Sequence, residues 1–213
     1  MFKLYRELKT NETFVIGADP SEGGDFCAAV AKSKKIFDSP FVFHGKIDSS
    51  TFGTELWKMG KFIYLKTGIY PYILVERNVG AATIAKLQEL NYPKLFRMPK
   101  LGTSYAEDPE NKIGWHTNEA TRIKMVDDYG TYIKQELGKV YDKETIAELM
   151  SFIRSRTGKP EAASGKHDDL CFAEFIAWQG CQLVQDVEAQ SFGASIAGFP
   201  QQDVFDDNGV PNV

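Results

Sequence analysis

The chain has 213 residues, of which 43% are hydrophobic and 25% are charged. This balance excludes a fibrous or mostly disordered protein, and the length suits one domain with its own core. The 25 Lys and Arg against 29 Asp and Glu give a formal net charge of −4. That charge excludes a uniformly basic nucleic-acid-binding surface but not a local basic groove. We find no apolar stretch of membrane-spanning length and no signal peptide.

The cysteines and histidines form no recognisable ligand or disulfide motif. Three cysteines, an odd number without a C-x-x-C pair, favour a reducing compartment over a disulfide framework. A zinc site would have to combine His167 and Cys171 with two further ligands that the spacing does not supply. The sequence therefore indicates neither a disulfide-rich secreted protein nor a zinc protein.

Apolar runs and turn residues predict an α/β fold in the first half of the chain. Three apolar runs joined by short polar turns indicate an antiparallel meander. The period then changes to helical spacing, with Phe52, Leu56 and Met59 on one helix face. A strand, a second helix and a short last strand follow, which predicts a mixed sheet of five strands. The predicted strands are 13–18, 26–31, 41–47, 71–75 and 93–98, and the predicted helices are 50–66 and 79–90.

The second half is mostly helical, with two polar interruptions. Residues 99–116 are expected to form a long loop, either a mobile surface loop or a lid over a groove. Residues 154–160 are basic and loop-like. We expect an N-terminal extension at 1–11, a folded domain at 12–187 and a flexible tail at 188–213. The predicted helices in this half are 119–136, 142–152 and 168–187.

Acidic residues stand at the ends of three predicted elements. Asp19 ends the first strand, Glu76 ends the fourth strand, and Asp168 with Asp169 opens the last helix. Taken singly, they suit a turn, an exposed ion pair and a helix N-cap. Taken together, they predict carboxylates that converge and need neutralising charge, which a divalent metal supplies. Two such ions clamp an in-line phosphoryl displacement.

Four separated motifs resemble, in the same order, the C-terminal nuclease domain of tailed-bacteriophage large terminase subunits, a member of the ribonuclease-H-like superfamily. The first motif is 18–25 (ADPSEGGD), the second is 75–78 (VERN) and the third is 165–170 (GKHDDL). Residues 113–117 and 122–124 resemble the segment before that family's long helix. The resemblance implies a ribonuclease-H-like mixed sheet flanked by helices.

This resemblance spans about residues 12–185 and implies a metal-dependent endonuclease. Such an enzyme cuts concatemeric double-stranded viral DNA during genome packaging. In that family an ATPase motor precedes the nuclease domain, but this chain has no G-x-x-x-x-G-K-S/T motif. The chain therefore resembles an isolated nuclease domain, whose full-length protein carries the motor and works with a small terminase subunit and a portal. The implied setting is the host-cell cytoplasm, without a membrane.

The resemblance also implies roles for the acidic residues, as catalytic groups and as ligands of two Mg²⁺ or Mn²⁺ ions. Asp19 is expected to bridge both ions and Glu76 to bind one. Asp168 or Asp169 binds the other, and the pattern does not decide between them. Both metals suit oxygen ligands. The candidates for the surroundings of the metals are Asp25, Lys166 and His167, each of which also suits a plain loop position.

Basic side chains on two segments are candidates for contacts with DNA phosphates. The segment 154–166 is favoured, because it leads into the third acidic motif. The full set is Arg77, Arg97, Lys100, Arg154, Arg156, Lys159 and Lys166. Two alternatives stay open: another ribonuclease-H-like nuclease, such as a junction resolvase, and a non-catalytic module that docks on a portal through its acidic tail.

Overall fold

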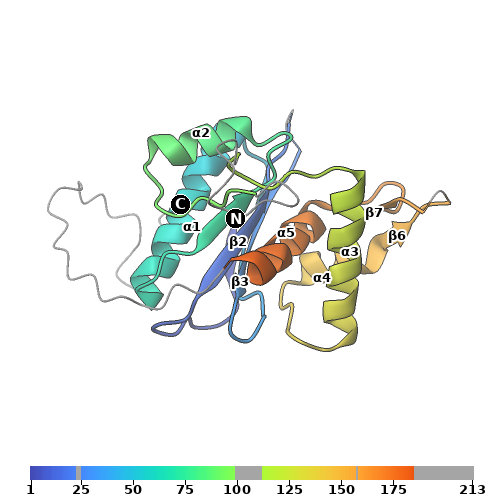
Figure 1. Ribbon diagram of the computed structural model, residues 1–213, viewed down its shortest axis with the longest axis horizontal. Coiled ribbons are helices and arrows are strands. Elements are labelled where there is room, and N and C mark those ends of the chain that lie inside the picture. Colours follow the sequence, from blue (N-terminus) through green and yellow to red (C-terminus); the bar gives the residue numbers. More distant parts are fainter. Residues whose placement is uncertain (23–24, 99–111, 157, 185–213) are drawn as a thin grey trace, which may run out of the picture.

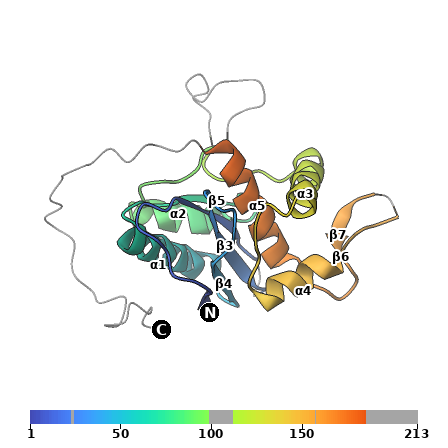
Figure 2. The same ribbon diagram turned by 90° about the horizontal axis from the view of Figure 1, so that it is seen from below.

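A five-stranded mixed sheet lies at the centre of the molecule, with helices on both faces (Figures 1 and 2). The computed structural model describes residues 1–22, 25–98, 112–156 and 158–184. The strand order is β1-β4-β3-β2-β5, where β5 is parallel to β2 and the other neighbours are antiparallel. The strands are β1 (Phe2–Leu4), β2 (Phe14–Asp19), β3 (Cys27–Ser33), β4 (Phe41–Gly45) and β5 (Tyr72–Val75).

The helices form one layer on each face of the sheet. Helices α1 (Ser49–Thr67) and α2 (Ala81–Glu89) cover one face, and α5 (Asp169–Leu183) covers the other. Helices α3 (Glu119–Lys134) and α4 (Lys143–Ser151) pack against α5 from outside. A two-stranded hairpin of β6 (Phe152–Arg154) and β7 (Pro160–Ala162) projects beside them. No helix of these described segments is long and apolar enough to cross a membrane.

Strand alternation decides which side chains face α5. In β2, Phe14, Ile16 and Ala18 belong to the core under α1, so the alternate positions, including Gly17 and Asp19, face α5. In β5, Leu74 belongs to the core under α5, and Glu76 follows it two positions later. Both acids at the strand ends therefore point to the face that α5 covers.

Gly17 lets α5 approach β2 closely. A Cβ atom at this position would lie 2.1 Å from the Ala173 carbonyl oxygen and 2.3 Å from the Ala177 nitrogen. We expect Gly17→Ala to lower the free energy of unfolding by about 3 kcal/mol in a urea titration, because backbone cannot yield to the methyl group. Gly130→Ala is the control, because a Cβ atom added at position 130 would have no atom of another part of the described structure within 4 Å. It is expected to stabilise α3 by about 0.5–1 kcal/mol. Equal effects of the two substitutions would contradict this.

The fifth strand of the sheet differs from the prediction. The predicted strand at 93–98 makes only isolated bridges, one between Ile73 and Leu95 and others from Arg97 to residues 113 and 114. The fifth strand is instead β1, within the segment expected as an N-terminal extension. Phe2 explains this pairing, because its ring packs at 5.5 Å from Phe41 and 5.0 Å from Phe43 between ring centroids. The expected lid at 99–116 and the tail at 188–213 lie mostly or wholly outside the described residues.

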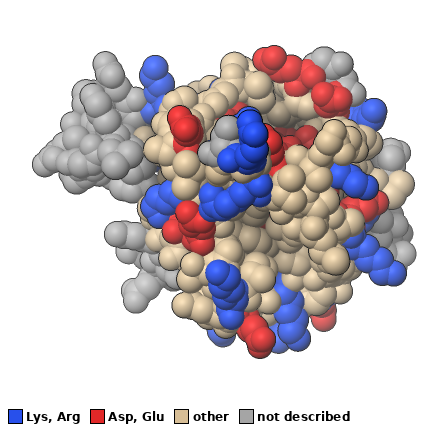
Figure 3. All heavy atoms as spheres, turned by 90° about the vertical axis from the view of Figure 1, so that its right-hand side faces the viewer, with Lys and Arg blue, Asp and Glu red and all other residues tan. Residues whose placement is uncertain are grey.

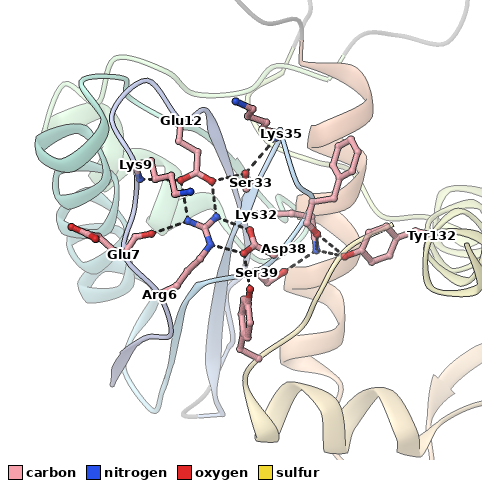
Figure 4. A network of polar contacts seen from close by, with 12 residues as sticks. Arg6, Glu7, Lys9, Glu12, Lys32, Ser33, Lys35, Asp38, Ser39 and Tyr132 are labelled. Carbon is pink, nitrogen blue, oxygen red and sulfur yellow. Dashed lines mark hydrogen bonds and ion pairs between the residues drawn. The ribbon is translucent and has the colours of Figure 1, made fainter. Parts of the chain in front are cut away.

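A buried ionic network ties the N-terminal segment to the sheet (Figure 4). Arg6 donates to both oxygens of Asp38, at 2.5 and 2.8 Å, and to both oxygens of Glu12, at 2.6 and 3.0 Å. Burial by itself raises the pKa of Glu12, but hydrogen bonds from Arg6, the Lys9 amide and Ser33 bring it below its usual value. The segment before β2 is thus part of the folded unit.

Candidate metal centre

Asp19 and Glu76 lie side by side at the carboxyl ends of two neighbouring parallel strands. The Glu76 amide donates to the Ala18 carbonyl at 2.8 Å, which extends the β2–β5 pairing to the acid itself. Glu76 is buried and Asp19 is half-buried. Asp168 stands at the N-cap of α5, and Asp169 is its first residue. The structure therefore brings the four predicted acids to one end of the sheet.

A cavity of about 740 Å³ opens at this point. Its walls come from the ends of β2 and β5, the start of α3, the β6–β7 hairpin and the start of α5. Figure 3 shows the molecule from the right-hand side of Figure 1, where Lys and Arg side chains border one side of a hollow that shows acidic atoms. The charged residues that line the cavity are Asp19, Glu76, Glu119, Arg122, Lys159 and Asp168.

Asp19 is the electrostatic centre of the cluster. Burial raises the pKa of the Asp19 carboxyl well above its usual value. The charges of Glu76, Asp169 and Asp168 raise it further, in that order, and the charge of Arg122 opposes them by a smaller amount. Carboxylates held this close do not all stay ionised without a cation. Their oxygen donors fit a divalent metal ion, which would remove the repulsion.

The Glu76 carboxylate is held rigidly by the turn that follows β5. Its Oε2 atom accepts the amides of Asn78 at 3.0 Å and Val79 at 3.3 Å. The Asn78 side chain in turn contacts Nδ1 of His116 at 2.7 Å and the Thr117 carbonyl at 2.5 Å. These contacts fix the carboxylate with its other oxygen available to a ligand, a feature of orienting groups around metal centres.

The two adjacent aspartates have different surroundings. Asp168 lines the cavity and accepts Nη2 of Arg122 at 3.2 Å. Arg122 also donates to the Pro160 carbonyl at 2.9 Å, so it links the hairpin to the acidic cluster. Asp169 lies toward His44, and burial followed by the charge of Asp168 raises its pKa. Both carboxylates act on Asp19, and only Asp168 lines the cavity.

Two of the three outer candidates, His167 and Asp25, interact with Asp169. His167 is exposed, with Nδ1 at 3.7 Å from Asp169 Oδ2. Asp25 is exposed and its charge raises the pKa of Asp169. Lys166 is exposed in the turn before α5, where its amide donates to the Ala163 carbonyl at 2.9 Å.

The basic candidates fall into two groups, one on the β6–β7 hairpin and one after β5. Lys159 lines it and lies 3.4 Å from Glu161, while Arg154 forms an ion pair with Asp127 on α3. Arg156 is exposed on the same hairpin. Arg77 follows Glu76 and is partly exposed, and Arg97 is exposed. Lys100 lies outside the described residues.

Three residues near the site were not singled out by the sequence reasoning. The sequence marks Arg122 only as part of the segment 122–124, which resembles the terminase nuclease family. Its contact with Asp168 depends on how α3 packs. His44 on β4 and Glu148 on α4 meet Asp169, so that their ligand atoms lie within 4.8 Å of one another. Burial raises the pKa of Glu148 to about 7, although the amides of Cys171 and Leu170 oppose it. No local signal marks these residues, because they lie in elements far apart in the sequence.

A mixed sheet with carboxylates at the ends of two parallel neighbours, facing a helix that opens with an acid, defines the ribonuclease-H-like class of folds. Comparison with solved structures shows which known proteins share this fold. The chain matches the large terminase nuclease from thermophilic phage G20c with TM-score 0.59 and 17% identity, over 83% of this chain and 85% of that one. The cobalt-bound form of the G20c nuclease gives TM-score 0.61 at 16% identity, over 83% and 84% of the two chains.

A second phage protein gives the same result. The large terminase nuclease domain of Thermus phage P74-26 matches with TM-score 0.57 and 16% identity, over 84% of this chain and 83% of that one. No family sequence model and no curated protein sequence matches the chain. The chain therefore has the fold of phage large terminase nuclease domains.

Proposed function

We propose that this chain is a metal-dependent endodeoxyribonuclease that cuts concatemeric double-stranded viral DNA during genome packaging. The observation that carries the proposal is the convergence of four acids at one end of the sheet, where Asp19, Glu76 and Asp168 line one cavity and Asp169 adjoins it. Burial, followed by the charges of the other three acids, raises the pKa of Asp19 well above its usual value. The positive charge of Arg122 lowers the pKa of Asp19, but burial and the three neighbouring acids outweigh it, so this cluster differs from a simple structural ion pair. A cluster of this kind in a cavity is a candidate catalytic site.

The cofactors proposed are two Mg²⁺ or Mn²⁺ ions. Asp19 would hold both, Glu76 one, and Asp168 or Asp169 the other. When bound, such ions activate a water nucleophile and stabilise the leaving oxygen of an in-line displacement at phosphorus. The G20c nuclease has been solved with bound cobalt, magnesium and zinc, which supports a divalent ion here.

Side chains of this protein would orient the metal-binding carboxylates and bind the DNA. Glu76 is held by two backbone amides and keeps its carboxylate aimed at the cavity. Arg122 stacks on Phe172 at 4.2 Å from the ring centroid and positions Asp168. Lys159 and Arg156 on the hairpin would contact DNA phosphates beside the cavity, which supplies affinity without sequence preference.

We propose that this domain works within a larger DNA-packaging assembly. An acidic domain of net charge −4 binds DNA weakly by itself. An ATPase motor, a small terminase subunit and a portal would bring DNA to it, in the host-cell cytoplasm. The match covers 85% of the G20c nuclease chain and 83% of the P74-26 nuclease domain, which supports an equivalent domain here.

Plasmid cleavage by the wild-type chain tests the proposal. Supercoiled plasmid, linear duplex and a four-way junction are incubated at low salt with a large molar excess of protein. Each is compared in Mg²⁺, in Mn²⁺ and with EDTA. We expect cleavage of plasmid and of plain linear duplex that requires the metal and that EDTA abolishes. Low salt and excess protein offset the weak binding, because phosphate contacts strengthen as salt falls.

Other outcomes identify the alternatives. Strong preference for the four-way junction over linear duplex would identify a junction resolvase. A folded protein that cuts none of the three substrates with either metal would contradict the nuclease proposal and leave the portal-docking module.

A further inference from the structure

His44 lies on the same face and in the same row of the sheet as Asp19. In the strand register, Asp19 is opposite Ala28 on β3, and Ala28 is opposite His44 on β4. Two strand spacings put the Asp19 and His44 backbones about 10 Å apart. The small Ala28 side chain between them leaves this face open to the start of α5, where Asp168 and Asp169 stand.

The His44 imidazole is oriented as a metal ligand is. Its Nδ1 atom lies 3.1 Å from Oε2 of Glu144, and the Phe26 ring stacks on it at 4.4 Å between centroids. Its Nε2 atom is buried and has no hydrogen-bond partner among the described residues. A carboxylate on one imidazole nitrogen fixes the tautomer and raises the basicity of the other, the usual arrangement behind a metal-bound histidine.

Two carboxylates lie beside the His44 imidazole. Glu148 reaches over from α4, and its Oε2 atom accepts the amides of Leu170 at 2.9 Å and Cys171 at 3.2 Å. Asp169 comes from the first turn of α5, and its Oδ2 atom is buried without a hydrogen bond. One ligand atom from each of His44, Glu148 and Asp169 lies within 4.8 Å of the others.

We propose that His44, Glu148 and Asp169 form a separate binding site for a transition-metal dication such as Zn²⁺, Co²⁺ or Mn²⁺. One imidazole nitrogen with two carboxylate oxygens suits these ions, whereas Mg²⁺ prefers oxygen ligands alone. Three protein ligands leave further coordination positions to water. The adjacent aspartates then serve different sites, Asp168 the cavity and Asp169 the His44 cluster.

The geometry favours a cation over a purely structural role. A buried imidazole nitrogen and a buried carboxylate oxygen that make no hydrogen bond each cost about 1–3 kcal/mol. One cation between them removes both costs and the repulsion between the two carboxylates. Hydrogen bonds to the start of α5 explain one oxygen of Glu148. The contacts of His44 with Glu144 and Phe26 hold its ring but do not explain why its Nε2 atom is buried without a hydrogen bond among the described residues.

Zinc binding by an untagged chain carrying Asp19→Asn tests the proposal. This substitution weakens the Asp19 centre in every sample, so the result does not depend on nuclease activity. Zn²⁺ affinity is measured by competition with a chromophoric chelator, and Co²⁺ absorption reports the ligand field. We expect one Zn²⁺ per chain, a loss of at least about 100-fold in affinity with His44→Gln or Glu148→Gln, and about 10-fold with Glu144→Gln.

His167→Gln is the matched control, because His167 is exposed and also close to Asp169. Its Zn²⁺ affinity should stay within about threefold of that of the Asp19→Asn chain. Circular dichroism shows whether each variant is folded. The proposal is overturned if the Asp19→Asn chain binds no Zn²⁺, if His44→Gln leaves affinity unchanged, or if His167→Gln causes the larger loss.

Discussion

Asp19→Asn is expected to lower DNA cleavage by at least about 100-fold and, at the same time, to raise the melting temperature of the metal-free protein. The first effect follows from the proposed function, because removal of one group that stabilises transition-state charge costs roughly that much. The second effect follows from the cluster itself. Asp19 is surrounded by Glu76, Asp168 and Asp169, and an amide of the same shape removes one of four repelling charges.

The contribution of Asp19 to the stability of the folded protein decreases as the pH rises. Burial, then the neighbouring acids, hold the pKa of Asp19 above the value of about 3.9 that it has in an unfolded chain. The folded protein therefore binds this proton more tightly than the unfolded chain does. Its contribution to stability is present at low pH and is lost as the pH rises through the raised pKa. Asparagine stays neutral, so the gain in melting temperature is expected above that pKa and should shrink as the pH falls.

Calorimetry in EDTA and in Mg²⁺, beside the cleavage assay, checks both effects. Mg²⁺ should raise the melting temperature of the wild type but change that of Asp19→Asn little, because a ligand stabilises only the state that binds it. Glu89→Gln is the control, since Glu89 is exposed on α2 and pairs only with Lys86 among the described contacts. Full cleavage by Asp19→Asn, or a lower melting temperature in EDTA at neutral pH, would show that Asp19 is not the centre of the cluster.

The positions of Asp19 and Glu76 can be predicted from the sequence because both acids come at the ends of apolar strands. A buried strand that stops at an acid places that acid at a sheet end, and alternation places both acids on one face. The convergence with Asp168 needs only that the last helix cover that face. These features depend on short-range pattern and on one packing contact.

Other parts of the structure depend on contacts that no local pattern records. Phe2 builds an edge strand of three residues, too short for alternation to reveal. The segment 93–98 has the composition of a strand but makes only bridges. His44 and Glu148 meet because α4 lies beside the end of β4, where Glu144 of α4 also contacts His44. Their separation of about one hundred residues hides the pair in the sequence.

Lys32 shows the same limit in the core. A lysine after an apolar run usually indicates that the strand has ended. Lys32 instead lies within β3, and its side chain is completely buried. Its partner is Glu174, which is also completely buried and lies on the inner face of α5. The pairing arises only when α5 packs on the sheet, so a sequence window around Lys32 cannot contain it.

Lys32→Met is expected to lower the free energy of unfolding by about 3–5 kcal/mol, because it leaves the Glu174 carboxylate buried without its counter-ion. Lys32 Nζ lies 2.9 Å from Glu174 Oε2. It also donates to Ser39 Oγ at 2.8 Å and to the Tyr132 hydroxyl at 3.3 Å (Figure 4). Burial by itself lowers the pKa of Lys32, but Glu174 and then Tyr132 raise it above its usual value. The ammonium is therefore charged in the folded protein.

The double variant Lys32→Met/Glu174→Leu separates a lost charge partner from a lost packing contact. Replacing both ions by apolar side chains of similar volume removes the cost of burying either charge, and such replacements are often neutral or stabilising. We expect the double variant to recover most of the stability lost in Lys32→Met, as measured by urea titration. Lys124→Met is the control, since its pair with Asp128 is exposed and should contribute under about 1 kcal/mol. If the double variant is as unstable as Lys32→Met, the ion pair contributes through the shape of the α5–β3 contact rather than through its charges.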